Sequence, residues 1–138
     1  MLDASVAAAW VLPRQATPAS EALLDAAHDS EFVTPRFFLY ELRRIVLKAE
    51  RTGVLTEGEA DDFLDEVWTL PILVEPDLSE DDLARIHNLA RATRLSFYDA
   101  IYLDVGLRSG LPVASGDRAL LTAALEQGVG VLDVRSET

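Results

Sequence analysis

The sequence has no cysteine, a single lysine and no apolar run approaching the roughly 18–20 residues of a membrane span. Without cysteine, a disulfide scaffold, a thiolate zinc site and a cysteine nucleophile are excluded, which fits a reducing compartment. No basic segment followed by an apolar one stands near Met1, so we expect a cytoplasmic protein without a secretory signal or membrane contact. P-loop, G-x-G-x-x-G and G-x-S-x-G motifs are absent, which leaves NTPase, dinucleotide-dependent dehydrogenase and acyl-hydrolase functions without support.

The composition is that of an ordinary globular protein. The chain has 138 residues, of which 49% are hydrophobic and 26% are charged. This length allows a hydrophobic core but leaves little room for a second domain, and no repeat or flexible linker divides the chain. We therefore expect residues 1–138 to form a single domain.

Acidic residues outnumber basic ones in one part of the chain only. The formal net charge is −12, and eleven of the 24 acidic residues lie between Thr52 and Ala84, where there is no lysine or arginine. The rest of the chain carries 12 basic and 13 acidic residues and is nearly neutral. Because nucleic acids bind to basic surfaces, this charge disfavours a polyanionic partner on the acidic segment alone.

Short apolar runs alternate with helical patterns along the chain. This alternation predicts an α/β fold with a mainly parallel sheet. The predicted strands are Met1–Asp3, Glu31–Thr34, Ile72–Val74, Pro112–Ser115 and Gly130–Val134. A serine or threonine followed three residues later by an acid predicts helix starts at Thr56-x-x-Glu59, Ser79-x-x-Asp82 and Ser96-x-x-Asp99.

Four carboxylates stand where a solvated surface acid is not needed. Asp3 ends the first predicted strand, and Asp117 follows the apolar run that ends at Ser115. Glu41 lies on an otherwise apolar helix face, and Asp99 stands at the start of a mostly apolar helix. Ligands of parallel sheets bind beyond the carboxyl ends of the strands, so Asp3 and Asp117 meet there if their strands are neighbours.

A set of carboxylates such as this one suggests metal-dependent chemistry. Clustered carboxylates repel one another, and a divalent cation is the simplest compensation. Mg²⁺ and Mn²⁺ prefer oxygen ligands and often share their coordination sphere with substrate phosphate, which points to phosphodiester hydrolysis by water. Each acid also has a structural alternative: Asp3, Asp99 and Asp117 could cap helices, and Glu41 could pair with Arg44.

Basic residues cluster on and beside the helix that carries Glu41. We consider Arg43 and Arg44 candidates for positioning a substrate phosphate beside the acids. The alternative is an ordinary solvated helix face.

Four segments of the chain resemble the PIN-domain ribonucleases, in particular the VapC-like toxins of type II toxin–antitoxin pairs. The segment Tyr98-Asp99-Ala100-Ile101-Tyr102-Leu103 is the most specific of them. The other matching segments are Leu2-Asp3-Ala4-Ser5-Val6, Pro35 through Glu41-Leu42, and Leu111 through Leu120. They occur in the family's order and span nearly the whole chain, although Arg44 stands where many relatives carry asparagine.

The resemblance implies a three-layer α/β/α fold for a single PIN domain over residues 1–138. Its central five-stranded parallel sheet would have the strand order 3-2-1-4-5. The implied activity is that of an endoribonuclease toxin acting on cellular RNA, such as tRNA or rRNA, with Mg²⁺ or Mn²⁺ as cofactor. The implied partners are the RNA substrate, a small VapB-like antitoxin that covers the active site, and a second copy of the chain in a homodimer.

The resemblance also assigns roles to the acids. Asp3, Glu41, Asp99 and Asp117 correspond to the family's catalytic cluster. We predict that the three aspartates of this cluster hold the metal ion and that Glu41 orients or deprotonates the attacking water. Nearby hydroxyl groups would support the carboxylates by hydrogen bonds, and the candidates are Ser5 and Ser115.

Two other functions compete with the nuclease. A catalytically inert PIN-like interaction module is one, and the presence of all four acids argues against it. A receiver-like Mg²⁺-binding signalling domain is the other, and it requires a lysine at a strand end, whereas Lys48 lies within a predicted helix. Divalent-metal binding distinguishes the nuclease from the inert module, and stable aspartyl phosphorylation identifies a receiver.

Overall fold

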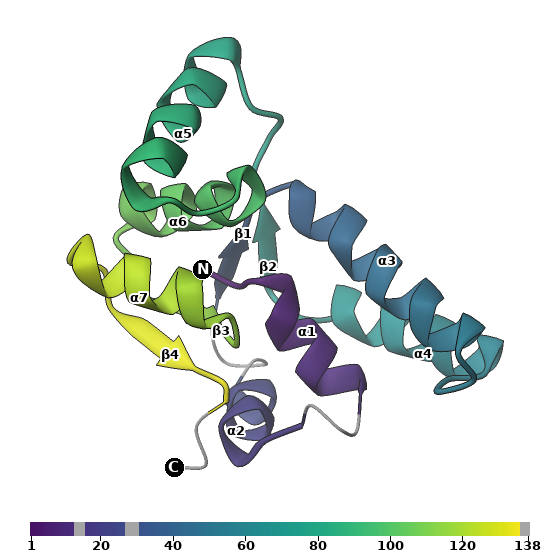
Figure 1. Cartoon of the computed structure of the whole chain (residues 1–138). Helices are drawn as coiled ribbons and strands as arrows, with labels where there is room; N and C mark the ends of the chain where they lie inside the picture. Colours follow the sequence, from purple (N-terminus) through teal and green to yellow (C-terminus); the bar gives the residue numbers. More distant parts are fainter. Residues whose placement is uncertain (13–15, 27–30, 136–138) are drawn as a thin grey trace.

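The computed structural model describes residues 1–12, 16–26 and 31–135 (Figure 1). The helices in this part of the chain are α1 (Ala4–Val11), α2 (Pro18–Ala26), α3 (Phe37–Arg51), α4 (Glu57–Trp68), α5 (Glu80–Thr93), α6 (Phe97–Ser109) and α7 (Arg118–Glu126). The strands are β1 (Phe32–Thr34), β2 (Ile72–Val74), β3 (Val113–Ser115) and β4 (Val131–Asp133). This alternation confirms the predicted α/β class. None of the described helices combines the length and apolar character needed to cross a membrane.

The strands form two parallel pairs joined through the start of the chain. β1 pairs with β2, and β3 pairs with β4. Between the pairs, the amide of Leu2 donates to the Val33 carbonyl at 3.0 Å, and the amide of Asp3 donates to the Ala114 carbonyl at 3.1 Å. The order across the sheet is therefore β2, β1, residues 1–3, β3, β4, in agreement with the predicted order 3-2-1-4-5.

The predicted number of five strands differs from the structure. Four strands of three residues each are formed in the described part of the chain, and the central segment makes only an isolated bridge between Leu2 and Ala114. The reason is local, because α1 already begins at Ala4 and leaves only residues 1–3 for pairing. The centre of the sheet is thus an extended segment that enters a helix immediately.

Helices cover the middle of the sheet more completely than its edges. All three residues of β3 are buried, and α1, α6 and α7 pack against this strand. On the edge strands, by contrast, the middle residues Leu73 and Leu132 are exposed. Burial on both faces is the pattern expected for the central strand of a three-layer α/β/α fold.

Helix α3 has one buried face and one face that remains accessible. Phe38, Leu42, Val46 and Ala49 recur at helical spacing and are buried, the first three of them in the main core. Glu41 is offset from this buried stripe and only partly buried. The same helix therefore anchors itself in the core and presents a polar side chain beside it.

A glycine allows α6 to approach β3 closely. A Cβ atom at Gly106 would stand 2.7 Å from Cγ2 of Val113, closer than packed atoms come. This contact places α6, which carries Asp99, directly against the strand that leads to Asp117.

Two of the three predicted capping boxes form in full. The side chains of Glu59 and Asp82 accept hydrogen bonds from the N-cap amides of α4 and α5. At the start of α6, the Asp99 amide donates to Ser96 Oγ at 3.1 Å, and in the described structure the reciprocal bond to the Asp99 carboxylate is not formed. The Asp99 side chain is therefore available for another role.

Candidate active site

Asp3 lies where the central segment of the sheet turns into α1. It occupies the N-cap position of that helix, but its carboxylate accepts no capping hydrogen bond. Instead, Oδ2 accepts hydrogen bonds from the hydroxyls of Ser5, at 2.7 Å, and Ser115, at 2.6 Å. The side chain is buried, so the capping alternative considered for Asp3 does not describe its contacts.

Asp117 follows β3 at the entrance to α7. Its Oδ1 accepts a hydrogen bond from the Leu120 amide at 3.0 Å and caps the helix, as the structural alternative predicted. Its own amide donates to Ser115 Oγ at 2.9 Å. Ser115 thus connects the backbone of Asp117 to the carboxylate of Asp3, and Oδ2 of Asp117 takes no part in the cap.

Glu41 projects from α3 and is held by a tyrosine of α6. The phenol of Tyr102 donates to Glu41 Oε2 at 2.9 Å. The predicted alternative of an ion pair with Arg44 is not found, because the described structure contains no such pair within 4.0 Å. Tyr102 lies three residues after Asp99, so one face of α6 brings both residues toward the same region.

The four acids open into one cavity of about 490 Å³ between α1 and α3. Asp3, Glu41, Asp99 and Asp117 all line it, and Ser5 does so as well. They come from four separate segments of the chain. The sequence prediction that Asp3 and Asp117 converge because their strands are neighbours is consistent with this arrangement.

The acids perturb one another electrostatically. Burial raises the pKa of Asp3, and the hydrogen bonds from Ser115 and Ser5 do not offset that increase. Burial, together with the negative charges of Asp117 and Asp3, raises the pKa of Asp99 to about 6. Burial also raises the pKa of Glu41, against the opposing hydrogen bond from Tyr102. The site therefore concentrates negative charge, which the nearby Arg44 offsets only in part.

The donor chemistry of this set fits a hard divalent cation. Carboxylate oxygens are the ligands that Mg²⁺ and Mn²⁺ prefer, and a cation would relieve the repulsion that raises these pKa values. Within residues 1–12, 16–26 and 31–135, however, no three histidine, aspartate or glutamate side chains form a ready-made metal cluster. The four acids share a cavity, but their side chains are not arranged around one common position for an ion.

Basic residues line the cavity on the side of α3. Arg44, one of the two candidates for positioning phosphate, is among them, whereas Arg43 is exposed and does not line the cavity. Lys48 also lines the cavity, although the sequence analysis did not select it for this role. Its spacing of four residues from Arg44 is the signal that places the two side chains on one helix face.

Comparison with known proteins assigns the chain to a family. The PIN domain family profile matches residues 1–125. The chain therefore belongs to the PIN-domain family.

Two individual proteins show which members of the family this chain is similar to. The chain is 28% identical over 120 residues to Ribonuclease VapC3 of Pyrobaculum aerophilum, which covers 87% of this chain and 90% of that protein. The crystal structure of PAE2754, also from Pyrobaculum aerophilum, superimposes with a TM-score of 0.73 at 26% identity, over 96% of this chain and 87% of that one. These matches confirm the predicted resemblance to VapC-like PIN-domain ribonucleases.

Proposed function

We propose that this protein is a metal-dependent endoribonuclease that hydrolyses phosphodiester bonds in cellular RNA. The observation that carries the proposal is the convergence of Asp3, Glu41, Asp99 and Asp117 from separate segments into one cavity. Membership of the PIN-domain family and the likeness to a protein named as a ribonuclease support it. Family membership also disfavours the receiver-like alternative.

Three aspartates would hold the metal ion, Mg²⁺ or Mn²⁺. Asp3 has Oδ2 occupied by two serine hydroxyls, which orient its remaining oxygen. Asp117 uses Oδ1 to cap α7, and Oδ2 remains for the ion. Asp99 stands at the start of α6 without a closed capping box. When bound, the ion supplies charge neutralisation at the scissile phosphate and a lower pKa for coordinated water.

Glu41 is the residue that we assign to the attacking water. Its Oε2 is fixed by Tyr102, which leaves Oε1 to accept a hydrogen bond from water. The raised pKa of Glu41 brings its proton affinity closer to that needed of a general base near neutral pH. Glu41 accepts a proton from the water as the water oxygen forms a bond to phosphorus, the P–O bond to the leaving nucleotide breaks, and the leaving oxygen takes up a proton from solvent.

Ser5 and Ser115 act as positioning residues in this scheme. Both donate to the same oxygen of Asp3, and Ser5 Oγ also accepts a hydrogen bond from the Gly116 amide at 2.8 Å. The two hydroxyls therefore fix the rotamer of Asp3 and limit its freedom to turn away from the cavity.

We also propose the biological setting that VapC-like proteins suggest. In it the nuclease acts as a toxin in the cytoplasm, a small VapB-like antitoxin neutralises it by covering the active site, and the chain forms a homodimer. Co-purification with the product of a neighbouring short gene, and light scattering of the isolated chain, test the antitoxin and the dimer separately.

The direct test of the activity is cleavage of total RNA by the purified protein. We expect discrete products in the presence of Mg²⁺ or Mn²⁺, no products with EDTA, and no products from Asp99→Asn under either metal. Asp65→Asn is the matched control, because it removes an exposed carboxylate of α4 that lies outside the cavity.

The outcomes separate the nuclease from its main alternative. Cleavage by Asp99→Asn at the parent rate with the same metal would contradict the assignment of the site. Failure of the wild-type protein to bind divalent ions by calorimetry would favour the catalytically inert interaction module.

A further inference from the structure

The cavity that contains the acids extends along α1 and α3 as a groove of different character. Along α1 the lining continues from the acids through Ala8 to Leu12, the C-cap residue of that helix, and on α3 it continues through Ile45 and Ala49. Val54, beyond the end of α3, also lines it and is 49% exposed. We call this part the α1–α3 groove. Its floor is apolar, and this apolar surface continues directly from the four carboxylates.

Two cations line the α1–α3 groove. Arg44 and Lys48 line it from α3, and four residues of helix separate them by about 6 Å along the axis. Neither side chain forms an ion pair within 4.0 Å in the described part of the chain. Elsewhere, arginines such as Arg85 and Arg108 are held by carboxylates. Both cations therefore lack a direct ion-pair partner in the described structure, although Arg44 lies near enough to Glu41 to lower the pKa of that carboxyl.

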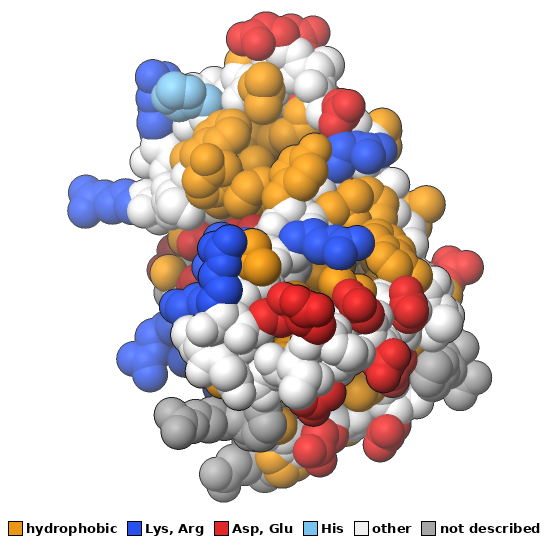
Figure 2. All heavy atoms as spheres, turned by 90° about the vertical axis from the view of Figure 1, so that its right-hand side faces the viewer, with side chains coloured by type: hydrophobic (Ala, Val, Ile, Leu, Met, Phe, Trp, Pro, Cys, Tyr) orange, Lys and Arg blue, Asp and Glu red, His pale blue; other side chains and the backbone are white. Residues whose placement is uncertain are grey.

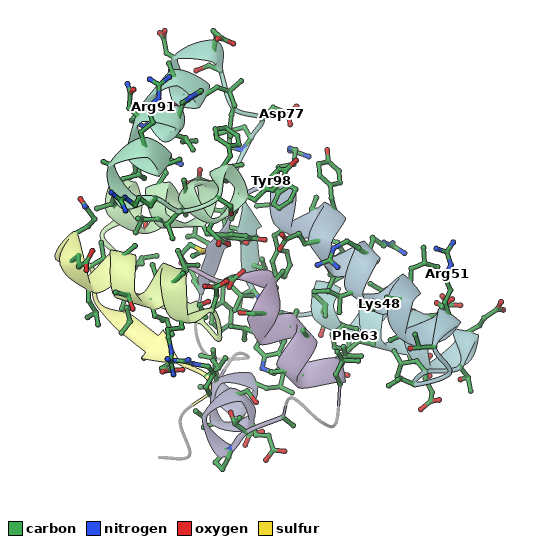
Figure 3. All side chains as sticks on the ribbon, in the orientation of Figure 1. Lys48, Arg51, Phe63, Asp77, Arg91 and Tyr98 are labelled. Atoms are coloured by element: carbon green, nitrogen blue, oxygen red, sulfur yellow. The ribbon has the colours of Figure 1, made fainter. Side chains whose placement is uncertain are left out.

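The surrounding surface makes this pair of cations distinctive. The chain carries a net charge of −12, and Lys48 is its only lysine. On the face that Figure 2 shows, Lys and Arg side chains lie beside apolar surface, with acidic side chains gathered below them. Lys48 and Arg51 both extend from α3, while Arg91 lies on α5 (Figure 3). Of these three residues, only Lys48 lines the groove.

We propose that the α1–α3 groove binds a single-stranded segment of RNA on one side of the cleaved bond. With the scissile phosphate at the acids, Arg44 and Lys48 contact the next phosphates along the strand. A base between them lies against the apolar floor formed by Ile45, Leu12 and Val54. This inference rests on the proposed nuclease function and adds the path of the substrate, with Lys48 as a further phosphate-binding residue.

An unpaired strand suits this groove better than a duplex or an acidic peptide. A cavity of about 490 Å³ lies within the roughly 300–1,000 Å³ typical of small-ligand sites, which suits individual nucleotides. A duplex conceals its bases and cannot use the apolar floor, whereas unpaired bases can be held against such a surface. An acidic peptide could use the two cations, but it has no phosphate to place among metal-bound acids.

The test compares charge removal inside and outside the groove. The probe is a short, fluorescently labelled single-stranded RNA of random sequence, and its binding is measured by anisotropy over a range of salt concentrations. Lys48→Ala and Arg44→Ala should each weaken binding about fivefold and reduce the slope of log K against log salt by about 0.7, the value for one phosphate contact on a single strand. Arg51→Ala and Arg91→Ala remove the same charge outside the groove and should leave the slope unchanged.

Cleavage assays give an independent measurement of the same contacts. On a cleavable RNA, Lys48→Ala should raise KM about fivefold and leave kcat unchanged, because the phosphate contact is the same in the ground and transition states. Lys48→Arg should restore most of the affinity, since it retains the charge. A structural defect would instead lower kcat and would not be corrected by this substitution.

Each outcome bears on one proposal or on both. Equal slopes for Lys48→Ala and Arg51→Ala, with cleavage intact, would overturn the strand path and leave the nuclease in place. Binding that depends on Lys48 without any cleavage would overturn the nuclease and retain the RNA groove. Dependence on Lys48 with double-stranded RNA or an acidic peptide as the preferred probe would overturn the assignment of the groove to a single strand.

Discussion

Asp3 and Asp104 are both buried aspartates, but their surroundings are opposite. Asp3 is 5% exposed, and its carboxylate is held by two serine hydroxyls without a cation. Asp104 is 3% exposed, and Arg85 binds both of its oxygens, at 2.9 and 3.0 Å, while Arg108 binds Oδ2 at 2.7 Å. The two aspartates are therefore similarly buried in opposite electrostatic surroundings.

The difference appears in proton affinity. Burial raises the pKa of Asp3, and its serine partners do not compensate. Burial acts in the same direction on Asp104, but the hydrogen bonds from Arg85 and Arg108 outweigh it and lower the pKa. Asp104 thus belongs to an ion-pair network with Arg85 and Arg108, and this network joins α5 to α6. Asp3 has no cationic partner within 4.0 Å in the described part of the chain, which suits the proposed metal site.

The largest expected difference between the two aspartates is in catalysis. Asp3→Asn should reduce RNA cleavage by about 1000-fold, equivalent to about 4 kcal/mol of transition-state stabilisation. Asparagine still accepts hydrogen bonds from the serine hydroxyls, so urea unfolding should show no loss of stability. Initial rates at saturating RNA and metal measure the effect. Cleavage within a few-fold of wild type would remove Asp3 from the site.

The next effect concerns stability at the other aspartate. Asp104→Asn should lower the free energy of unfolding by about 2–3 kcal/mol, less than for a fully buried ion pair because both arginines are partly exposed and can be hydrated. Urea denaturation measures the change, and the cleavage rate per folded molecule should not change. A loss of cleavage without a loss of stability would mean that Asp104 serves the reaction.

The stabilisation that a bound metal ion gives should differ between the two aspartate variants, by a smaller free energy than the changes above. At a Mg²⁺ or Mn²⁺ concentration ten times its Kd, the ion should stabilise the wild-type protein by about 1.4 kcal/mol. Asp3→Asn should lose this stabilisation, and Asp104→Asn should retain it. Thermal unfolding with and without the ion gives the comparison, and an equal shift in both variants would contradict a metal site at Asp3.

The comparison can also be tested through the pH dependence of stability. Because Asp99 has a pKa of about 6 in the folded protein and an ordinary value of 3.8, the folded state binds more protons between these values. Without metal, this group's contribution to stability is present below pH 3.8 and is lost as the pH rises through about 6. Asp99→Asn should abolish that loss in urea titrations across this range.

Asp104 should show the opposite sign in the same experiment. Its pKa is lowered in the folded protein, so its contribution is present above its ordinary value of 3.8 and is lost as the pH falls below it. If Asp99→Asn and Asp104→Asn changed the pH profile in the same direction, the proposed distinction between the two kinds of carboxylate would be wrong.

The strand order and the cluster of four acids were expected from the resemblance to PIN-domain ribonucleases, whereas local patterns predicted only the parallel strands and the positions of two of the acids. Apolar runs at regular intervals predicted parallel strands, and Asp3 and Asp117 both stand at carboxyl ends of such runs. The number of strands could not be predicted correctly, since the early start of α1 at Ala4 leaves too few residues for a regular central strand.

The sequence analysis did not predict the ion pairs of Asp104, and the reason is physical. Its spacing of four residues from Arg108 was visible, but its main partner, Arg85, comes from another helix and is found only through tertiary packing. Lys48 is a similar case. Its position one turn after Arg44 could be read from the sequence, but only the cavity shows that both side chains line the same groove.

The hydroxyl of Ser115 ties two of the four acidic residues of the site to the sheet. This single oxygen donates to Asp3 and accepts from the Asp117 amide, and its residue lies in a fully buried strand. Asp3 and the backbone of Asp117 are therefore locked to one rigid edge. In the proposed metal site, Glu41 on α3 and Asp99 on α6 are the two acids that Ser115 does not tie to this edge.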